Sequence, residues 1–249
     1  MSDDYLTYEK KVPDHKPSGR FIELWAPAPG SADVFSGTSF GSGSNLPSKT
    51  GNRIKRAIDI TGALAGLALL APLLLGIALL IRVTSRGPAL FVQKRYGLDG
   101  QLFQIYKFRS MYLETCDPSG RQQTIAGDTR VTPIGRFLRR TNFDELPQLL
   151  NVLKGDMSLV GPRPHVPGML AAGVPYEDFD SRYMLRHNVR PGITGLAQVE
   201  GWRGETKEWR AAKMRLEYDL EYVRNHSVSV DLKILAKTIA TEFFGGTGN

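Results

Sequence analysis

The sequence predicts a mixed fold that is mostly α-helical, with a small β-hairpin or sheet and one membrane-inserted helix near the N-terminus. Residues 60–81 are 22 consecutive residues without a charged side chain, a length that suits a membrane helix. Apolar and aromatic runs flank the Asp99-Gly100 pair, a pattern typical of a hairpin. Later segments repeat apolar residues at the three- and four-residue spacing of amphipathic helices.

Composition limits the class of protein. Apolar residues make up 41% of the 249 residues and charged residues 23%. A packed core is therefore expected, and disorder along the whole chain is excluded. The net charge of +7 favours anionic partners: nucleic acid, lipid headgroups or phosphorylated substrates. The single cysteine, Cys116, excludes an internal disulfide framework and a cysteine-rich zinc site.

Residues 1–52 are predicted to be a flexible leader. From residue 26 onward this segment is dominated by Gly, Ser and Pro. Such a composition cannot bury enough apolar surface to offset the entropy lost on ordering.

Residues 53–86 are predicted to form a re-entrant membrane helix. The apolar stretch within them would be about 33 Å long as a helix, and a bilayer core is about 30 Å thick. Pro72 lies near the middle of the stretch, where a proline removes a backbone hydrogen bond and bends the helix. Basic residues stand on both sides of it, whereas a single crossing usually has its Lys and Arg excess on the cytoplasmic side. They are Arg53, Lys55 and Arg56 before the stretch and Arg82 and Arg86 after it.

A helix that enters the bilayer, bends at Ala71-Pro72 and leaves through the same face explains both the proline and the symmetric charges, so we expect a monotopic protein. Two alternatives stay open from these residues: a kinked helix that crosses the membrane, and a buried helix of a soluble protein.

Residues 87–249 are predicted to form a domain on the cytoplasmic side. Its expected elements are hairpin strands at 89–94 and 102–108, a surface loop at 112–132, a helix at 136–154, and helices at about 205–224 and 231–244. Asp231 is a predicted N-cap. Leu232, Leu235 and Ile239 share one face of the last helix, with Lys233 and Lys237 elsewhere. This helix either lies on the headgroup layer as an interfacial amphipathic helix or covers the core.

The adjacent carboxylates of Asp144 and Glu145 are candidate catalytic residues. A structural role is also open, because Asn142 and Glu145 have the spacing of a helix capping box. The cations around the pair favour chemistry, since arginines absorb charge on phosphate oxygens while carboxylates bind Mg²⁺ or attack phosphorus. They include Arg136, Arg139, Arg140, Lys154, Arg163, Arg186, Arg190, Arg203 and Arg210.

Other reaction templates are absent from the sequence. It contains no Gly-x-x-x-x-Gly-Lys-Ser/Thr loop, no Gly-x-Ser-x-Gly turn and no His-Glu-x-x-His pair, which excludes P-loop enzymes and the hydrolases that depend on those motifs. The four histidines lack metal-ligand spacing. No nucleic-acid-binding pattern accompanies the basic charge, so a nucleic-acid partner is not expected.

Five motifs together resemble the bacterial sugar transferase family, whose members are small monotopic phosphoglycosyl transferases. The first is Lys55-Arg56-x-x-Asp59, before the apolar stretch. The others are Tyr106-Lys107-Phe108-Arg109-Ser110-Met111, Asp144-Glu145-Leu146-Pro147-Gln148, the run from Asn151 to Pro164, and Arg190-Pro191-Gly192-Ile193-Thr194-Gly195. The resemblance covers about residues 52–244.

The resemblance implies a two-step reaction. By that likeness Asp144 attacks the β-phosphorus of a UDP-sugar, releases UMP and carries the sugar phosphate as a covalent ester. A polyprenyl phosphate, normally undecaprenyl phosphate, then accepts the sugar phosphate. Glu145 would assist by orienting metal or acceptor, and Mg²⁺ is the implied cofactor, with Asp144 and Glu145 as its carboxylate ligands. Lys107, Arg163 and Arg190 match phosphate-binding positions, and Asp219 matches a further active-site position.

We therefore expect an undecaprenyl-phosphate hexose phosphotransferase that uses UDP-glucose or, second, UDP-galactose and initiates an exopolysaccharide repeat unit. Its place would be the inner leaflet of the bacterial inner membrane, with the catalytic domain in the cytoplasm. A non-catalytic membrane scaffold of a polysaccharide assembly complex is the alternative. A homo-oligomer is compatible with the sequence, which decides neither the oligomeric state nor the hexose.

Overall fold

The computed structural model describes residues 49–115 and 127–244. The predicted leader lies almost wholly outside the described residues, as does the middle of the predicted loop at 112–132. The helices are α2 (Lys49–Thr84), α3 (Pro133–Arg140), α4 (Gln148–Lys154), α5 (Tyr176–Phe179), α6 (Leu196–Val199), α7 (Trp209–Asn225) and α8 (Val228–Phe244). The strands are β1 (Leu90–Tyr96), β2 (Leu102–Phe108), β3 (Ser158–Val160), β4 (Leu170–Ala171), β5 (Val174–Pro175) and β6 (Gly192–Thr194).

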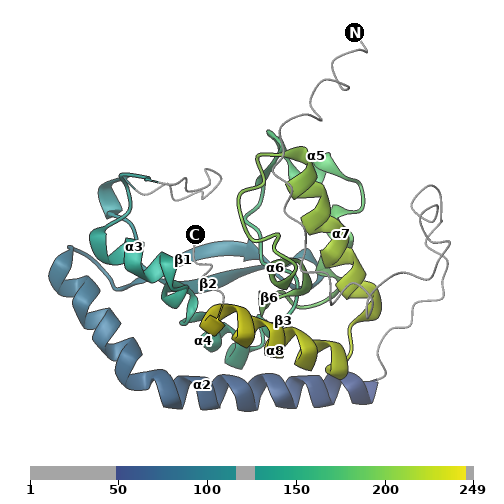
Figure 1. Cartoon of the computed structure of the whole chain (residues 1–249), viewed down its shortest axis with the longest axis horizontal. Coiled ribbons are helices and arrows are strands. Elements are labelled where there is room, and N and C mark those ends of the chain that lie inside the picture. The colour runs from purple at the N-terminus through teal and green to yellow at the C-terminus, as the bar shows by residue number, and fades with distance from the viewer. Residues whose placement is uncertain (1–48, 116–126, 245–249) are drawn as a thin grey trace, which may run out of the picture. The chain divides into compact units, whose positions relative to one another are not determined.

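Helix α2 contains the whole apolar stretch and bends part-way along its length (Figure 1). Pro72 is the proline inside this 36-residue helix, and it supplies the physical cause of a bend because it cannot donate a backbone hydrogen bond. Residues 52–84 are long and apolar enough to cross a membrane, and only 11% of the most apolar window is buried. Such exposure is unlike the core helix of a soluble protein. Large apolar side chains such as Leu69, Leu75 and Val83 are open to the surroundings.

The predicted hairpin is confirmed. Strands β1 and β2 pair antiparallel in a register that places Phe91 opposite Lys107 and Arg95 opposite Phe103. The connecting turn holds Asp99 and Gly100 in the left-handed region, with φ of 54° and 71°. Aspartate and glycine tolerate that region best, so the Asp-Gly pair stands where the turn needs it.

The helix predicted over 136–154 is wrong as one continuous element. The structure has α3, then the 3₁₀ helix η5 (Phe143–Glu145), then α4. Asn142 adopts φ 56° and ψ 15°, and a left-handed residue ends a right-handed helix. Thr132 starts α3 by accepting a hydrogen bond from the backbone N–H of Gly135 at 2.9 Å. The break turns the Asp144–Glu145 segment out of the helical path.

Two apolar clusters pack α2 against the rest of the described chain. Ala63 of α2 lies with Leu149 and Val152 of α4 and with Ile105 of β2. Further along α2, Ile77 and Ile81 pack with Leu138 of α3 and Phe108 of β2. Both halves of α2 therefore contact the domain that follows it.

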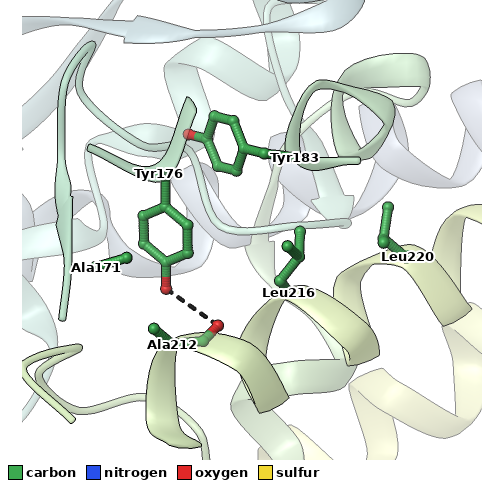
Figure 2. Close-up of a cluster of buried hydrophobic side chains, with 6 residues drawn as sticks. All are labelled: Ala171, Tyr176, Tyr183, Ala212, Leu216 and Leu220. Carbon is green, nitrogen blue, oxygen red and sulfur yellow. Dashed lines mark hydrogen bonds between the residues drawn. The ribbon is translucent and has the colours of Figure 1, made fainter. Parts of the chain in front are cut away.

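A third cluster forms the core on the α7 side. Figure 2 shows Tyr176 and Tyr183 lying against one another above the α7 residues Ala212 and Leu216. The Tyr176 hydroxyl donates to the carbonyl of Ala212 at 3.4 Å. This cluster packs α7 against the segment that contains Ala171, Tyr176 and Tyr183.

Helices α7 and α8 confirm the two C-terminal helices, with one correction. Helix α8 begins at Val228, so Asp231 is inside its first turn and is not the N-cap. Its carboxylate instead accepts hydrogen bonds from Lys55 at 2.6 Å and from the Tyr222 hydroxyl at 2.7 Å. Val230 and Ile234 of α8 are buried, whereas Leu232 and Ile239 are exposed. One face of the helix covers the core and another stays open.

Candidate active site

The candidate site forms where the 3₁₀ helix η5 meets strand β2 and the segment after β3. Asp144 and Glu145 lie on η5, Lys107 is the penultimate residue of β2, and Arg163 follows β3 by three residues. The structure therefore brings together four residues that the sequence analysis singled out from three separate motifs.

Glu145 is held by two cations. Lys107 Nζ donates to its Oε1 at 2.7 Å, and Arg163 Nη1 donates to its Oε2 at 2.9 Å. Arg163 Nη2 also donates to Oε1, so the guanidinium and carboxylate form a two-pronged pair. Burial alone would raise the pKa of Glu145, but the charges and hydrogen bonds of Arg163 and Lys107 hold it well below its usual range.

The capping box predicted for Asn142 and Glu145 does not form. Asn142 makes no side-chain capping bond to this turn, because the Glu145 carboxylate points to Lys107 and Arg163 instead. Glu145 is thus ionised and fully paired, and it fixes both cations beside its neighbour.

Asp144 has the opposite environment. Its residue surface is 8% exposed, and among the described residues no hydrogen bond or ion pair reaches its carboxylate. Burial, followed by the charge of Glu145, raises the pKa of Asp144 to about 6, although Lys107, Arg139 and Arg163 oppose the increase. A buried carboxylate without a partner is a poorly solvated anion, which makes it the candidate nucleophile of the pair.

Arg186, which is buried, and Arg95, which is half-buried, hold the segment that carries Arg163. Arg186 Nη2 donates to the carbonyl of Arg163 at 2.7 Å, and Arg95 Nη1 donates to the carbonyl of Pro164 at 3.2 Å. Their bonds fix the backbone on both sides of the Arg163 side chain. Burial and the charge of Arg163 lower the pKa of Arg95 to about 10.

Sequence reasoning did not single out Arg95. Strand alternation would have found it, since side chains two residues apart on a strand share a face. The register puts Phe91 opposite Lys107 and Arg95 opposite Phe103, so Arg95 lies on the face of the hairpin that carries Lys107.

Asp219 is linked to the site through Arg186. Its Oδ2 accepts hydrogen bonds from Arg186 Nε at 3.0 Å and Nη2 at 2.6 Å. The two side chains are 3% and 1% exposed. The Arg186 guanidinium also lies over the Tyr183 ring, 5.5 Å from its centroid. In this arrangement Asp219 orients the arginine that holds Arg163.

Arg190 lies apart from the four clustered residues. It is exposed, and its Nε donates to the carbonyl of Gly155 at 2.9 Å. No hydrogen bond or ion pair in the described ranges links it to Asp144 or Glu145.

The donor set fits Mg²⁺ at Asp144 and not at Glu145. The carboxylate of Asp144 is available, and Mg²⁺ is commonly held by one or two carboxylates with substrate phosphates and water. Both oxygens of Glu145 already accept hydrogen bonds from Lys107 and Arg163, and two adjacent positive charges oppose a dication. In the part of the chain that the structure describes, no group of three or more acidic, His or Cys residues forms a ready-made metal cluster.

The N-terminal end of α2 is tied to the same domain as the site. Lys55 donates to the carbonyl of Val160 at 3.2 Å as well as to Asp231. Arg56 donates to the carbonyls of Val152 and Leu153 at 2.7 and 2.9 Å, at the end of α4. The Asp59 carboxylate accepts from the Ser158 hydroxyl at 2.9 Å. This gives the first of the five motifs a structural purpose.

The C-terminal end of α2 is tied to that domain too. Arg109, directly after β2, donates to the carbonyls of Ser85 and Arg86 at 2.9 and 2.5 Å. Its side chain therefore closes the segment that joins α2 to β1.

Comparison with known proteins identifies the family. The family model described as bacterial sugar transferase matches residues 50–245. The chain belongs to the bacterial sugar transferase family. Because the match extends over α2 and the domain that follows it, the membrane-type helix and the carboxylate site are parts of one family module. This transferase is an enzyme of the sugar-1-phosphate transferase class.

Individual relatives of this family member differ in length. An exopolysaccharide production protein of Rhizobium leguminosarum bv. phaseoli is 51% identical over 195 residues, which is 78% of this chain and 98% of the relative. A UDP-glucose:undecaprenyl-phosphate glucose-1-phosphate transferase of Escherichia coli is 49% identical over 190 residues, 76% of this chain and 40% of the relative. An N-acetylgalactosaminephosphotransferase of Aeromonas hydrophila is 43% identical over 207 residues, 82% of this chain and 47% of the relative. The chain therefore spans nearly all of the first relative and less than half of the other two.

Proposed function

We propose that this bacterial sugar transferase moves hexose-1-phosphate from a UDP-hexose to undecaprenyl phosphate, with release of UMP, and so initiates an exopolysaccharide repeat unit. The proposal rests on one observation. Asp144 is a buried carboxylate without a partner among the described residues, and the adjacent Glu145 has its charge neutralised by Lys107 and Arg163. The names of the relatives support the substrate class, and glucose is the commonest sugar in them. UDP-glucose is accordingly the first donor to test, and UDP-galactose the second.

In the first step, an Oδ of Asp144 attacks the β-phosphorus of the donor. The new bond joins that oxygen to phosphorus, and the bond from phosphorus to the bridging oxygen breaks. UMP leaves with the electron pair, and the sugar phosphate stays on Asp144 as an acyl phosphate. Glu145 holds Lys107 and Arg163, whose charges act on Asp144 and would oppose the negative charge that gathers on the phosphate oxygens.

In the second step, a phosphate oxygen of the lipid acceptor attacks the same phosphorus and the Asp144 carboxylate departs. In this proposal Arg190 is a cation that attracts the incoming substrates. Asp219 acts indirectly, because it orients Arg186. Mg²⁺ held at Asp144 would neutralise charge on the donor diphosphate when bound.

We propose a re-entrant, monotopic α2 on the cytoplasmic leaflet of the inner membrane. The support is that both ends of the helix are bonded to one domain: Lys55, Arg56 and Asp59 at one end, and the Ser85 and Arg86 carbonyls at the other. A helix that crossed the bilayer would put its ends on opposite sides, out of reach of a single domain. Cysteines introduced at Asn52 and Arg86, both exposed, should react with an impermeant reagent from the same side. Reaction from opposite sides would refute this topology.

The enzymatic test uses Asp144→Asn in the full chain, reconstituted in nanodiscs. UMP release from UDP-glucose should be lost, because an amide cannot serve as the nucleophile. Asp99→Asn is the matched control, since Asp99 is an exposed turn residue whose left-handed backbone asparagine also tolerates. Turnover retained by Asp144→Asn would exclude Asp144 as the nucleophile.

Donor labelled with ³²P in the β-phosphate separates the enzyme from a scaffold. The proposal expects label on acid-quenched wild-type protein and none on Asp144→Asn. A non-catalytic membrane scaffold would give no protein-bound label and no UMP from any UDP-sugar in a panel that includes glucose, galactose and N-acetylgalactosamine donors.

A further inference from the structure

Arg95 carries a positive charge that no carboxylate of the described chain balances. Its Nη1 donates to the carbonyl of Pro164 at 3.2 Å, and its Nη2 donates to Gln93 Oε1 at 2.6 Å. Both of these acceptors are neutral. Its Nε is shielded from solvent and forms no hydrogen bond within the described ranges. Because a guanidinium has donors but no acceptor, one that is taken out of water is normally matched by an anion.

The carboxylates of the candidate site do not supply that anion. Glu145 is already paired with Lys107 and Arg163, and Asp144 forms no ion pair with any described residue. With Arg95 included, the cations of this cluster outnumber its two carboxylates. The excess is largest while Asp144 is protonated, and it leaves the site positively charged before a substrate binds.

The charge of Arg95 acts on the site although its side chain does not bond to the acidic pair. Burial, followed by repulsion from Arg163, lowers the pKa of Arg95 to about 10, and Glu145 opposes the decrease. Burial also lowers the pKa of Lys107; Glu145 opposes that decrease, while Arg163 and Arg95 add to it. The folded enzyme therefore holds these like charges together at a cost in free energy. A negatively charged ligand among them would offset that cost.

We propose that Arg95 is a determinant of donor binding, whose unbalanced charge attracts the diphosphate of the UDP-hexose to Lys107 and Arg163. To react as proposed, the donor must bring its β-phosphorus to Asp144, on which both of those cations act. The anionic diphosphate thereby enters the field to which Arg95 contributes. Fixed charges in a site with little water act more strongly than charges in bulk solution. The inference rests on the proposed function, because it takes the UDP-hexose as the ligand.

A purely structural role for Arg95 would depend on its hydrogen bonds and not on its charge. The bond to Pro164 fixes the backbone next to Arg163, and an uncharged N–H donor is able to make a bond of that kind. Lysine keeps the charge but loses the planar fork of donors, whereas glutamine keeps an N–H donor and has no charge. Comparison of Arg95→Lys with Arg95→Gln therefore separates the two roles.

The test measures the affinity of the full chain for UDP-glucose by isothermal titration calorimetry in nanodiscs. The parent protein and every variant carry Asp144→Asn, so that the donor is bound and not consumed. Arg95→Gln should raise the dissociation constant by at least about tenfold, whereas Arg95→Lys should keep it within about threefold. Lys94→Met is the matched control, since Lys94 is an exposed cation on the opposite face of the same strand. It should bind the donor like the parent.

Thermal unfolding supplies a second measurement. Without ligand, Arg95→Gln should melt at or above the temperature of the parent, because the substitution removes an unbalanced charge. Loss of a structural support would instead lower the melting temperature. UDP-glucose at one fixed concentration should raise the melting temperature of the parent more than that of Arg95→Gln, because a ligand that binds more tightly stabilises the folded state more.

Three results would overturn the inference. One is equal affinity of the parent and Arg95→Gln for UDP-glucose. Another is a loss of affinity in Arg95→Lys as large as that in Arg95→Gln. The third is weaker binding by Arg95→Gln together with a lower melting temperature, which would assign Arg95 a structural role. Failure of the proposed function would be distinct, because the parent itself would then bind no UDP-glucose, and the inference would fall with it.

Discussion

Replacing the proposed nucleophile should stabilise the folded enzyme at neutral pH. The carboxylate of Asp144 is buried and has no partner among the described residues, so the folded state holds it at a pKa of about 6 in place of 3.8. A folded-state pKa above the unfolded value means that ionisation costs the folded state free energy. That cost is absent below pH 3.8 and grows as the pH rises to 6, above which it is constant.

The size of the effect follows from the shift. A difference of about two pKa units, at ~1.4 kcal/mol each, corresponds to roughly 3 kcal/mol above pH 6. Asp144→Asn removes the charge while keeping the size of the side chain, so up to this amount should return as stability. For a domain of about 200 residues, each kcal/mol raises the melting temperature by about 2–4 °C.

The assay is thermal unfolding of the full chain in one detergent at pH 7.5 and at pH 4. Asp144→Asn should melt several degrees above wild type at pH 7.5 and near wild type at pH 4. The Asp99→Asn control should show no difference at either pH. Asp144→Asn could instead melt below wild type at pH 7.5, or raise the melting temperature equally at both pH values. Either result would show that Asp144 is not an ionised carboxylate without a partner in the folded enzyme.

Three further predictions concern the site and its supports. First, a pH–rate profile of UMP release should fall on acidification with a midpoint near pH 6, because Asp144 takes up a proton. Glu145→Gln removes a neighbouring negative charge and frees two cations, so it should lower that midpoint by at least about one unit. Second, Asp219→Asn should lower stability by about 3 kcal/mol or more, because it leaves the buried Arg186 charge without a carboxylate; denaturant melts would test this, and an unchanged midpoint would show that the pair is dispensable. Third, Asn142→Gly should melt close to wild type, whereas Asn142→Ala should cost about 1–2 kcal/mol because alanine resists φ 56°. Equal melting of the two variants would contradict the strain argument.

Local pattern was sufficient for the elements whose signals lie close together in the chain. The apolar stretch predicted α2, and Pro72 predicted its bend. The Asp99-Gly100 pair predicted the hairpin. Spacing of apolar residues predicted α7 and α8 with boundaries a few residues off. In each case the deciding interactions are backbone geometry and hydropathy within a few turns, so distant residues have little influence.

Local pattern failed where a distant contact decided the structure. A helix across residues 136–154 satisfies propensity, yet Asn142 takes a left-handed conformation and turns the acidic pair toward β2. Asp231 has the chemistry of an N-cap but is drawn to Lys55, which is 176 residues earlier in the chain. Glu145 has the spacing of a capping box, but Lys107 and Arg163 outcompete the backbone N–H groups, since a charge-assisted bond is stronger than a neutral one.

By itself the sequence determined the family, the presence of a membrane-type helix and the identity of the carboxylate pair, because each is written in short motifs or in hydropathy. The family resemblance gave the two carboxylates different roles, but only the tertiary structure showed the different surroundings of their side chains. Adjacent in the chain, Asp144 and Glu145 differ because β2 and the segment after β3 deliver their cations to one of them alone. The same packing turns Arg139 of α3 toward Ser110 and leaves Arg136 and Arg140 exposed. That difference depends on position around the helix, which composition does not reveal.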